Sequence, residues 1–307
     1  MKVLVTGGAG FIGSNLVRAL LERGDEVRVL DNISTGNRPN LEGLDIEIVE
    51  GELRSYERVH AATRGTEVVY HLGALGSVPR SVQDPLTSNA VNVDGTLNVL
   101  LAARDEGVRR VVYSSSSSVY GNSGELPRTE AMPTDPISPY GVAKLAAERY
   151  CVSFSRVYHD FETVVLRYFN VFGERQSPFS QYAAVVPLFV TAIADERPVT
   201  IYGDGEQSRD FTYVGNVVDA TIRAGTAADA SGAIFNVAAG APGSVNLLAD
   251  TIGRILDKPV EKRHAEPRPG DVRNSWADVS AAQQVLGYRP SIDLEAGLRR
   301  TIAFLAR

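Results

Sequence analysis

Three residues in the chain have the types and spacing to move a proton: Ser116, Tyr140 and Lys144. Tyr140 and Lys144 are four residues apart, and the apolar periodicity of residues 141–158 predicts a helix, so both side chains lie on one helix face. A free tyrosine has a pKa of about 10, and a neighbouring ammonium favours the phenolate and lowers that value. The spacing therefore predicts that Tyr140 is a general base near neutral pH, with Ser116 hydrogen-bonded to the same substrate oxygen.

The serine run that contains Ser116 comes directly after a predicted strand. Residues 109–114 contain the apolar run Val111–Tyr113, and the chain then continues through the five serines Ser114–Ser118. In an open parallel sheet, ligands bind beyond the carboxyl ends of the strands. A serine run elsewhere is typical of a linker, but this one is placed where a ligand would bind.

A glycine-rich turn opens the chain. Residues 2–6 form an apolar run typical of a buried strand, residues 12–23 have a helical period, and Gly7, Gly10 and Gly13 lie at the junction. Gly7 allows the turn, Gly10 lets the backbone approach a pyrophosphate, Gly13 lets the helix pack closely, and the helix N-terminus faces the phosphates. Asp31 ends the next predicted strand and favours NAD over NADP by accepting hydrogen bonds from the ribose. With the proton-transfer residues, this turn predicts hydride transfer between a nicotinamide and an alcohol or ketone carbon.

The spacing Gly-x-x-Gly-x-x-Gly, together with Tyr-x-x-x-Lys, resembles the extended short-chain dehydrogenase/reductase superfamily and its NAD-dependent epimerase/dehydratase family over nearly the whole chain. Residues 76–81 and 172–176 make the resemblance closest to the bacterial UDP-glucose and UDP-N-acetylglucosamine 4-epimerases. This resemblance implies oxidation of the sugar at carbon 4 by bound NAD, with Tyr140 as base, and return of the hydride to the opposite face. It also implies a homodimer built on helices 86–106 and 141–158, with which an apolar stripe at Val91, Leu97, Leu100 and Leu101 is compatible.

The resemblance also assigns the NAD contacts, which include Lys144 on the nicotinamide ribose and Glu52 at the adenine edge, where the family usually has Asp. The predicted cofactor-binding residues are Gly7, Gly10, Phe11, Ile12, Gly13, Asp31, Asn32, Glu52, Leu53, Leu72, Gly73, Ala74, Asn92, Ser114, Tyr140, Lys144 and Tyr168.

Arginine is the donor best suited to a diphosphate, and Arg175, Arg209 and Arg268 are candidates. The segments around Arg209 and Arg268 resemble the pyrophosphate contacts of the nucleotide-sugar epimerases. The same resemblance places Asn170 at the sugar, Tyr202 at the uracil and Asp271 at its ribose. The predicted substrate-binding residues are Arg80, Ser116, Asn170, Val186, Leu188, Tyr202, Arg209, Arg268, Asp271 and Ser275.

Several alternatives remain open within this resemblance. A 4,6-dehydratase would carry an Asp-Glu pair where this chain has Ser117 and Ser118, which cannot serve as the acid and base of water elimination. The UDP-glucuronate 4-epimerases differ at Asn170 and Ser177, although Arg80 could pair with a uronate carboxylate. A product-releasing reductase and a non-catalytic NAD-binding sensor are the other options. The resemblance also implies that position 275 faces the 2-substituent of the sugar, where the small Ser275 leaves room for an N-acetyl group that a tyrosine would exclude.

Composition limits the class of protein further. The chain has 307 residues, is 44% hydrophobic, has a net charge of −6 and contains one cysteine, Cys151. The negative charge argues against nucleic acid as a partner, the four histidines lack metal-ligand spacing, so no metal is expected, and no apolar run predicts a leader or a membrane span. The single cysteine favours a reducing, cytoplasmic location.

The order of predicted elements alternates between strand and helix, which favours a doubly wound parallel α/β sheet of the Rossmann type with a smaller, interleaved C-terminal substrate lobe. Residues 1–170 would form the NAD-binding domain, to which residues of about 209–240 also belong. Residues of about 171–208 and 241–307 would form the substrate lobe. The predicted strands are 2–6, 26–30, 45–49, 67–71, 109–114, 162–168 and 234–238. The predicted helices are 12–23, 55–63, 86–106, 141–158, 181–195, 215–228, 244–257, 279–286 and 294–305.

Overall fold

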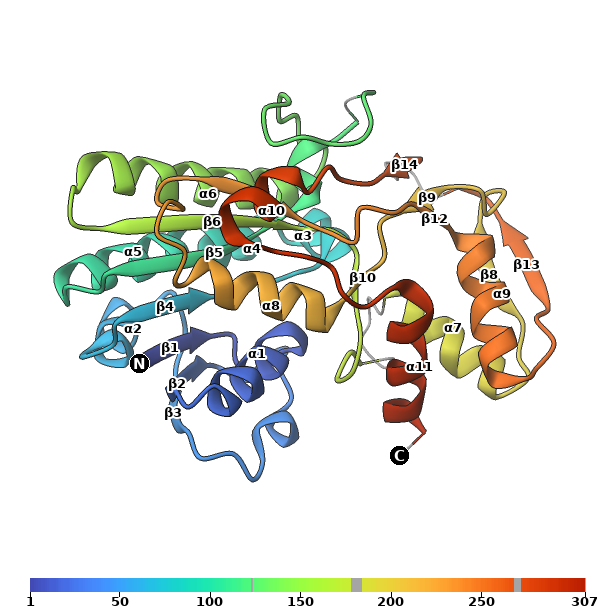
Figure 1. Ribbon diagram of the computed structural model, residues 1–307, viewed down its shortest axis with the longest axis horizontal. Helices are drawn as coiled ribbons and strands as arrows, with labels where there is room; N and C mark the ends of the chain where they lie inside the picture. Colours follow the sequence, from blue (N-terminus) through green and yellow to red (C-terminus); the bar gives the residue numbers. More distant parts are fainter. Residues whose placement is uncertain (123, 178–183, 268–271, 307) are drawn as a thin grey trace.

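The computed structural model describes residues 1–122, 124–177, 184–267 and 272–306, and its centre is a parallel sheet of seven strands (Figure 1). The strand order is β11-β6-β5-β4-β1-β2-β3, and it reverses between β1 and β4. This is the predicted doubly wound sheet, and all seven predicted strands are present. They are β1 (Lys2–Thr6), β2 (Glu26–Asp31), β3 (Glu47–Glu50), β4 (Val68–His71), β5 (Arg110–Ser116), β6 (Glu162–Tyr168) and β11 (Ile234–Val237).

Helices cover both faces of this sheet and bury two separate hydrophobic clusters. Alternate residues of a strand point to opposite faces, and accordingly Val3 and Val5 join one cluster while Leu4 joins the other. The first cluster includes side chains of α1 (Phe11–Glu22) and α8 (Val214–Ala224). The second includes side chains of α2 (Tyr56–Thr63), α5 (Gly95–Asp105) and α6 (Pro139–Val157). Because both faces are covered, the strands consist of nearly continuous apolar runs.

The region predicted as one helix over residues 86–106 is divided. It consists of α4 (Pro85–Asn89), a π-helical segment η2 (Ala90–Asp94) and α5. A further helix, α3 (Val78–Gln83), precedes it and was not predicted, because six residues are too short for a periodic pattern. Ser77 caps this helix by accepting the backbone N–H of Arg80 at 3.2 Å. The remaining helical turns are η1 (Arg38–Leu41) and η3 (Ser117–Tyr120).

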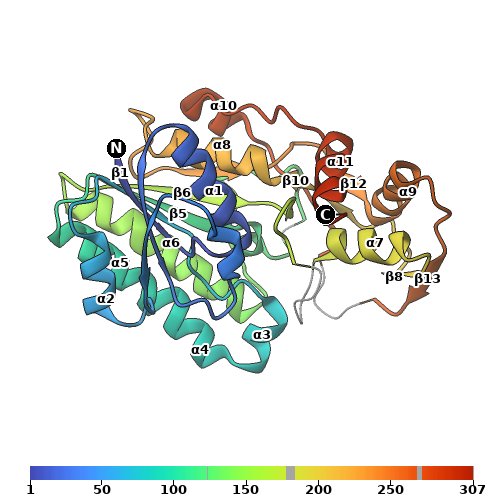
Figure 2. The ribbon, with the colours of Figure 1, turned by 90° about the horizontal axis from the view of Figure 1, so that it is seen from below.

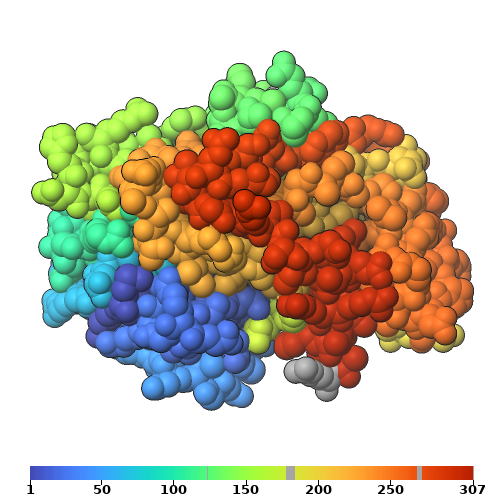
Figure 3. All heavy atoms as spheres, viewed as in Figure 1, coloured from blue at the N-terminus to red at the C-terminus, as the bar shows by residue number. Residues whose placement is uncertain are grey.

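The C-terminal segments gather beyond the carboxyl ends of the sheet strands (Figures 1 and 2). In the space-filling view, their orange and red atoms cover most of the right-hand side of the molecule (Figure 3). The helices in the C-terminal part of the chain are α7 (Val185–Ala194), α9 (Val245–Leu256), α10 (Ser280–Leu286) and α11 (Leu294–Leu305). The short strands are β7 (Val171–Phe172), β8 (Val199–Tyr202), β9 (Ser208–Arg209), β10 (Thr212–Tyr213), β12 (Gly243–Ser244), β13 (Lys262–Ala265) and β14 (Asn274–Ser275). The predicted helix 181–195 begins in residues 181–183, which lie outside the described residues.

Candidate active site

The glycine turn between β1 and α1 has no room for side chains. A Cβ atom on Gly13 would lie 2.1 Å from the carbonyl oxygen of Gly7, and one on Gly7 would lie 2.7 Å from Cα of Gly73. Gly7 also has a φ of 71°, in the left-handed region that glycine favours. Gly10 precedes the helix, and no side chain caps the helix N-terminus. Helix N-termini of this kind favour anions, so the turn fits the pyrophosphate of a dinucleotide.

Asp31 is fixed beside this turn at the end of β2. Its Oδ2 accepts the backbone N–H of Ala9 at 2.9 Å, and its Oδ1 accepts the N–H of Ile33 at 2.8 Å. A carboxylate has about four acceptor positions, so this one can also accept from ribose hydroxyls. The neighbouring Asn32 is exposed and binds Ser34 through Oδ1.

The predicted adenine-side residues have different roles in the structure. Glu52 is half-exposed and forms an ion pair with Arg54. Leu53 packs against the backbones of Gly73 and Gly95, where a Cβ would approach it to 2.9 Å and 2.8 Å. Leu53 therefore helps to shape the loop after β4, in which Leu72, Gly73 and Ala74 are half-buried.

Asn92 holds the same loop from the π-helical segment. It is buried, its Oδ1 accepts the N–H of Leu75 at 2.8 Å, and its Nδ2 donates to the Leu75 carbonyl at 3.2 Å. The side chain expected to contact the cofactor therefore positions the loop backbone.

Sequence reasoning missed His71, which organises the same region. The Thr96 hydroxyl donates to the carbonyl of Asn92 at 2.7 Å, so it accepts from Nε2 of His71 at 3.0 Å. Nδ1 of His71 then accepts the Thr6 hydroxyl at 2.7 Å, and Thr6 accepts the N–H of Gly73. Burial and the charge of Lys144 lower the pKa of His71 to about 3, which keeps the ring neutral. The sequence feature that could have indicated this role is the position of His71 at the end of an apolar strand.

The three proton-transfer residues come together at the carboxyl end of β5. Ser116 is the last residue of β5, and Tyr140 and Lys144 lie in the first two turns of α6. Ser138 caps this helix by accepting the N–H of Gly141, and Ser81 accepts the N–H of Tyr140 at 3.0 Å. The structure therefore places Tyr140, the predicted base, at a fixed helix start, next to the serine run.

In the chain by itself, Lys144 makes contacts other than the one expected with Tyr140. The ammonium of Lys144 donates to the carbonyl of Ser114 at 2.7 Å and lies over the Tyr113 ring. Burial raises the pKa of Tyr140, and it is a hydrogen bond with Ser116, not Lys144, that lowers it. Burial also lowers the pKa of Lys144 to about 8, so this group still carries its charge at neutral pH.

Tyr168, also predicted at the cofactor, lies beneath this region. Its hydroxyl shares a hydrogen bond of 2.6 Å with Thr221 of α8, and burial raises its pKa. Tyr168 and Ser116 are register partners across β6 and β5.

The predicted substrate residues divide into three groups. Arg209 and Ser275 are register partners on β9 and β14, and Asn170 follows β6 in the left-handed region, with a φ of 28°. Leu188 and Tyr202 are exposed on α7 and β8, whereas Val186 is buried in the core. Arg80 is half-buried on α3, next to α6, and Arg268 and Asp271 lie outside the described residues.

Arg175, considered as a phosphate ligand, serves another purpose. Its Nη1 donates to Oδ1 of Asn15 on α1 at 2.7 Å, and its guanidinium lies over the Phe304 ring of α11. Arg175 thus joins the cofactor helix to the C-terminal helix. Asp210, which sequence reasoning passed over, accepts backbone N–H groups of Ala239 and Gly240, and burial raises its pKa to about 6.

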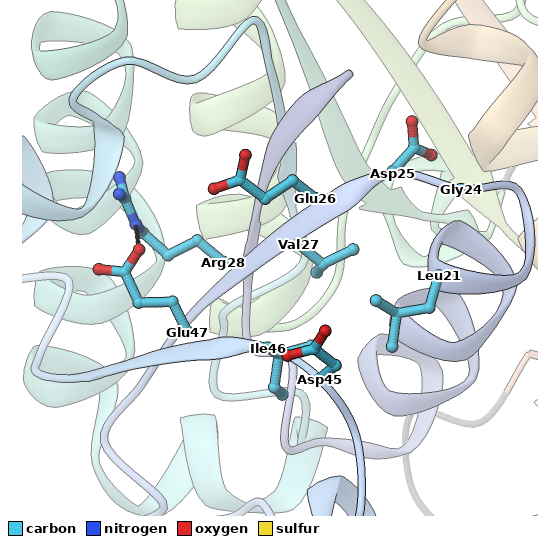
Figure 4. A pocket seen from close by; sticks show the side chains of 9 residues that line it. All are labelled: Leu21, Gly24, Asp25, Glu26, Val27, Arg28, Asp45, Ile46 and Glu47. Atoms are coloured by element: carbon cyan, nitrogen blue, oxygen red, sulfur yellow. Dashed lines mark hydrogen bonds and ion pairs between the residues drawn. The ribbon is translucent and has the colours of Figure 1, made fainter.

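A surface pocket of about 500 Å³ lies elsewhere, where β2 and β3 begin (Figure 4). Its lining includes Glu26 and an ion pair between Arg28 and Glu47. Ligands of open parallel sheets bind at the opposite ends of the strands, so this pocket is not the candidate site. Among the described residues, no cluster of His, Cys, Asp or Glu could hold a metal ion, and no helix is long and apolar enough to cross a membrane.

The sheet and the glycine turn define a Rossmann-type dinucleotide-binding protein. A profile of the "NAD dependent epimerase/dehydratase family" matches residues 3–238, and the chain belongs to this family.

Solved structures extend the similarity over the whole chain. The UDP-glucose 4-epimerase of Thermotoga maritima, solved with UDP-glucose, is 37% identical, with 100% and 99% of the two chains covered and a TM-score of 0.95. The UDP-N-acetylglucosamine 4-epimerase of Methanobrevibacter ruminantium, solved with UDP-N-acetylmuramic acid, is 38% identical, with 99% and 98% covered and a TM-score of 0.95. The UDP-glucose 4-epimerase of Thermus thermophilus, solved with NAD, is 37% identical, with 100% and 99% covered and a TM-score of 0.92.

Proposed function

We propose that this protein interconverts UDP-glucose and UDP-galactose by 4-epimerisation, with a tightly held NAD, and that it tolerates N-acetylated sugars. The observation that carries the proposal is that Ser116, at the carboxyl end of β5, lies beside α6, whose first turns hold Tyr140 and, one turn further on, Lys144. The family membership and the glycine turn beside Asp31 support NAD as the cofactor.

In this proposal each residue has a defined task. NAD, held by the glycine turn and Asp31, supplies the hydride acceptor and donor at carbon 4. Tyr140 takes the proton of the sugar 4-hydroxyl through its phenolic oxygen and later returns it, while Ser116 hydrogen-bonds the same sugar oxygen. Lys144 fixes the Ser114 carbonyl and would hold the nicotinamide ribose. Arg209 anchors the diphosphate, which leaves the sugar free to turn between its two faces.

The other proposed ligand contacts follow from the division of the chain. We propose residues 1–170, with 209–240, as the NAD-binding domain and the remainder as the substrate lobe, which contributes Tyr202 and Ser275, with Asn170 at its border.

The alternative activities are less well supported by the residues. Ser117 and Ser118 argue against a 4,6-dehydratase. A UDP-glucuronate 4-epimerase remains the second candidate because Arg80 lies on α3, whose neighbour α6 carries Tyr140. A cytoplasmic location stays a prediction that rests on the single cysteine.

Substrate choice provides the direct test. Initial rates on UDP-glucose, UDP-N-acetylglucosamine and UDP-glucuronate should show turnover of the first two and little of the third. Ser275→Tyr should lower kcat/KM for UDP-N-acetylglucosamine more than about tenfold, or about 1.4 kcal/mol, because the ring fills the space of the acetyl group. The value for UDP-glucose should change little, and Ser280→Tyr, at an exposed position on α10, should change neither. Turnover of UDP-glucuronate alone would reject the proposed substrate.

We also propose the homodimer built on the region 86–106 (α4, η2 and α5) and on α6, which α3 borders. In the predicted stripe, Leu100 is fully buried, whereas Val91, Leu97 and Leu101 are half-buried. Large apolar side chains are nevertheless exposed on these helices, and Val82, Leu86 and Val157 are 63%, 83% and 61% exposed. An exposed apolar face of this kind is typical of an interface.

Light scattering should therefore give twice the 33.0 kDa mass of one chain. Leu86→Glu should shift the mass toward a monomer because it places a charge in the apolar face. Leu247→Glu, on the exposed side of α9, should leave the dimer intact. A monomer in the unaltered protein would remove this proposal.

A further inference from the structure

A fully buried ion pair joins α6 to β6 close to the proton-transfer residues. Arg167 binds Glu148 through two hydrogen bonds, from Nη2 at 2.6 Å and from Nε at 3.0 Å. The two side chains are 1% and 0% exposed. Glu148 lies on α6 four residues beyond Lys144 and eight beyond Tyr140, and residues spaced by four lie on one helix face. The pair is therefore built on the helix face that carries the proposed base.

The same pair holds both ends of the segment that contains Ser116. On one side, the Ser115 hydroxyl donates to Oε2 of Glu148 at 3.0 Å. On the other side, the Arg167 guanidinium lies over the ring of Tyr120, 4.7 Å from its centre. Ser116 stands between these two contacts, in the turn from β5 to η3.

The contact network continues beyond Tyr120 into the strand at the edge of the sheet. The Tyr120 hydroxyl donates to Oδ1 of Asn236 at 2.6 Å, and Nδ2 of Asn236 donates to the carbonyls of Arg128 and Asp278. Asp278 lies three residues after Ser275, the residue proposed to face the sugar. One buried network therefore runs from the catalytic helix to the chain segment that carries the proposed specificity residue.

Stability alone does not account for this pair. Removing a carboxylate and a guanidinium from water costs free energy that their attraction often does not recover, and apolar replacements of similar size are commonly neutral or stabilising. A buried pair can instead select one arrangement of the elements that it joins. We propose that Glu148 and Arg167 are positioning residues that fix Ser116, in the turn from β5 to η3, relative to Tyr140 on α6.

This inference rests on the proposed function, since turnover is its principal readout. The test variant is the double substitution Glu148→Leu with Arg167→Met, which removes both charges and leaves neither partner alone. Its urea midpoint should stay close to that of the unaltered protein. Its kcat should fall about 10-fold to 100-fold, because small misplacements of a reacting group have effects of this size. KM for the UDP-sugar and Kd for NAD should change much less.

The pH dependence of kcat distinguishes a positioning role from a general loss of rigidity. Because the hydrogen bond with Ser116 lowers the pKa of Tyr140, displacing Ser116 should move the acid limb of the kcat profile to higher pH, by about one unit. Ser115→Ala, which removes one contact and leaves the ion pair, should move the limb in the same direction by a smaller amount.

The matched control is the ion pair of Arg110, at the start of β5, and Glu162, at the start of β6, where the two side chains lie 2.7 Å apart. Arg110→Met with Glu162→Met should leave kcat and its pH profile unchanged. The inference is overturned if the folded Glu148→Leu/Arg167→Met protein keeps the kcat and the profile of the unaltered protein. If that variant does not fold, an unchanged profile in Ser115→Ala overturns it.

A crystal structure of either variant keeps this test independent of the proposed function. If the unaltered protein turns over no UDP-sugar, the proposed function fails, and the separation between the Ser116 hydroxyl and the Tyr140 phenol still decides the inference. An increase in that separation supports the positioning role. If the two groups occupy the same positions as in the unaltered protein, the positioning role is contradicted.

Discussion

Replacing Tyr140 by phenylalanine should lower kcat by about 10²-fold to 10⁴-fold, the range expected for loss of a general acid–base group. The substitution removes one oxygen and keeps the ring, so the start of α6 and its cap at Ser138 should persist. Kd for NAD should change little, because the glycine turn and Asp31 are untouched. Single-turnover rates and NAD titration measure the two quantities separately.

Tyr150→Phe is the matched control for this prediction. Tyr150 lies ten residues further along α6 and is 41% exposed, so losing its hydroxyl should leave kcat unchanged. Turnover in Tyr140→Phe at the rate of the unaltered protein would reject Tyr140 as the base.

Gly13→Ala should disrupt cofactor binding through a single methyl group. The new Cβ would lie 2.1 Å from the Gly7 carbonyl oxygen and 2.9 Å from Cα of Gly8, so α1 must move away from β1. Overpacking of this kind typically costs about 1–3 kcal/mol, and each 1.4 kcal/mol of binding free energy is a factor of ten in Kd. We therefore expect NAD to bind about 10-fold to 100-fold more weakly, as measured by calorimetry, with a lower urea midpoint.

Gly124→Ala provides the comparison, since a Cβ at Gly124 would meet no atom within 4 Å. Kd for NAD and the urea midpoint should both be unchanged in that variant. Equal NAD affinity in Gly13→Ala and the unaltered protein would contradict the tight contact between α1 and the glycine turn.

The main elements of the fold could be predicted because their signals are local. Most strands of the seven-stranded sheet contain a short apolar run bounded by glycine or polar residues, and α1, α8 and α9 have clear helical periods. The two-residue strands β9, β12 and β14 carry no such signal, since their pairing depends on segments far apart in the chain. The helix α3 was missed for a related reason, because its six residues contain less than two turns.

In the proposed site, too, features within one element could be predicted, whereas contacts between distant segments could not. The glycine turn and the pair of Tyr140 and Lys144 are visible as spacings within one element. The sequence could not show that Lys144 binds the Ser114 carbonyl, or that Arg175 binds Asn15, because these contacts join distant segments. Glu148 and Arg167 were passed over because each reads as an ordinary charged residue until the fold buries them together.

The most direct test of 4-epimerisation with a retained cofactor is to incubate the protein and UDP-glucose with far less NAD than sugar. NMR of the sugar and the absorbance of NADH should be followed together. UDP-galactose should form up to its equilibrium proportion while no NADH accumulates, since each hydride returns to the sugar. Accumulation of NADH in step with a released oxidised sugar, or absence of UDP-galactose from protein that has bound NAD, would contradict this expectation.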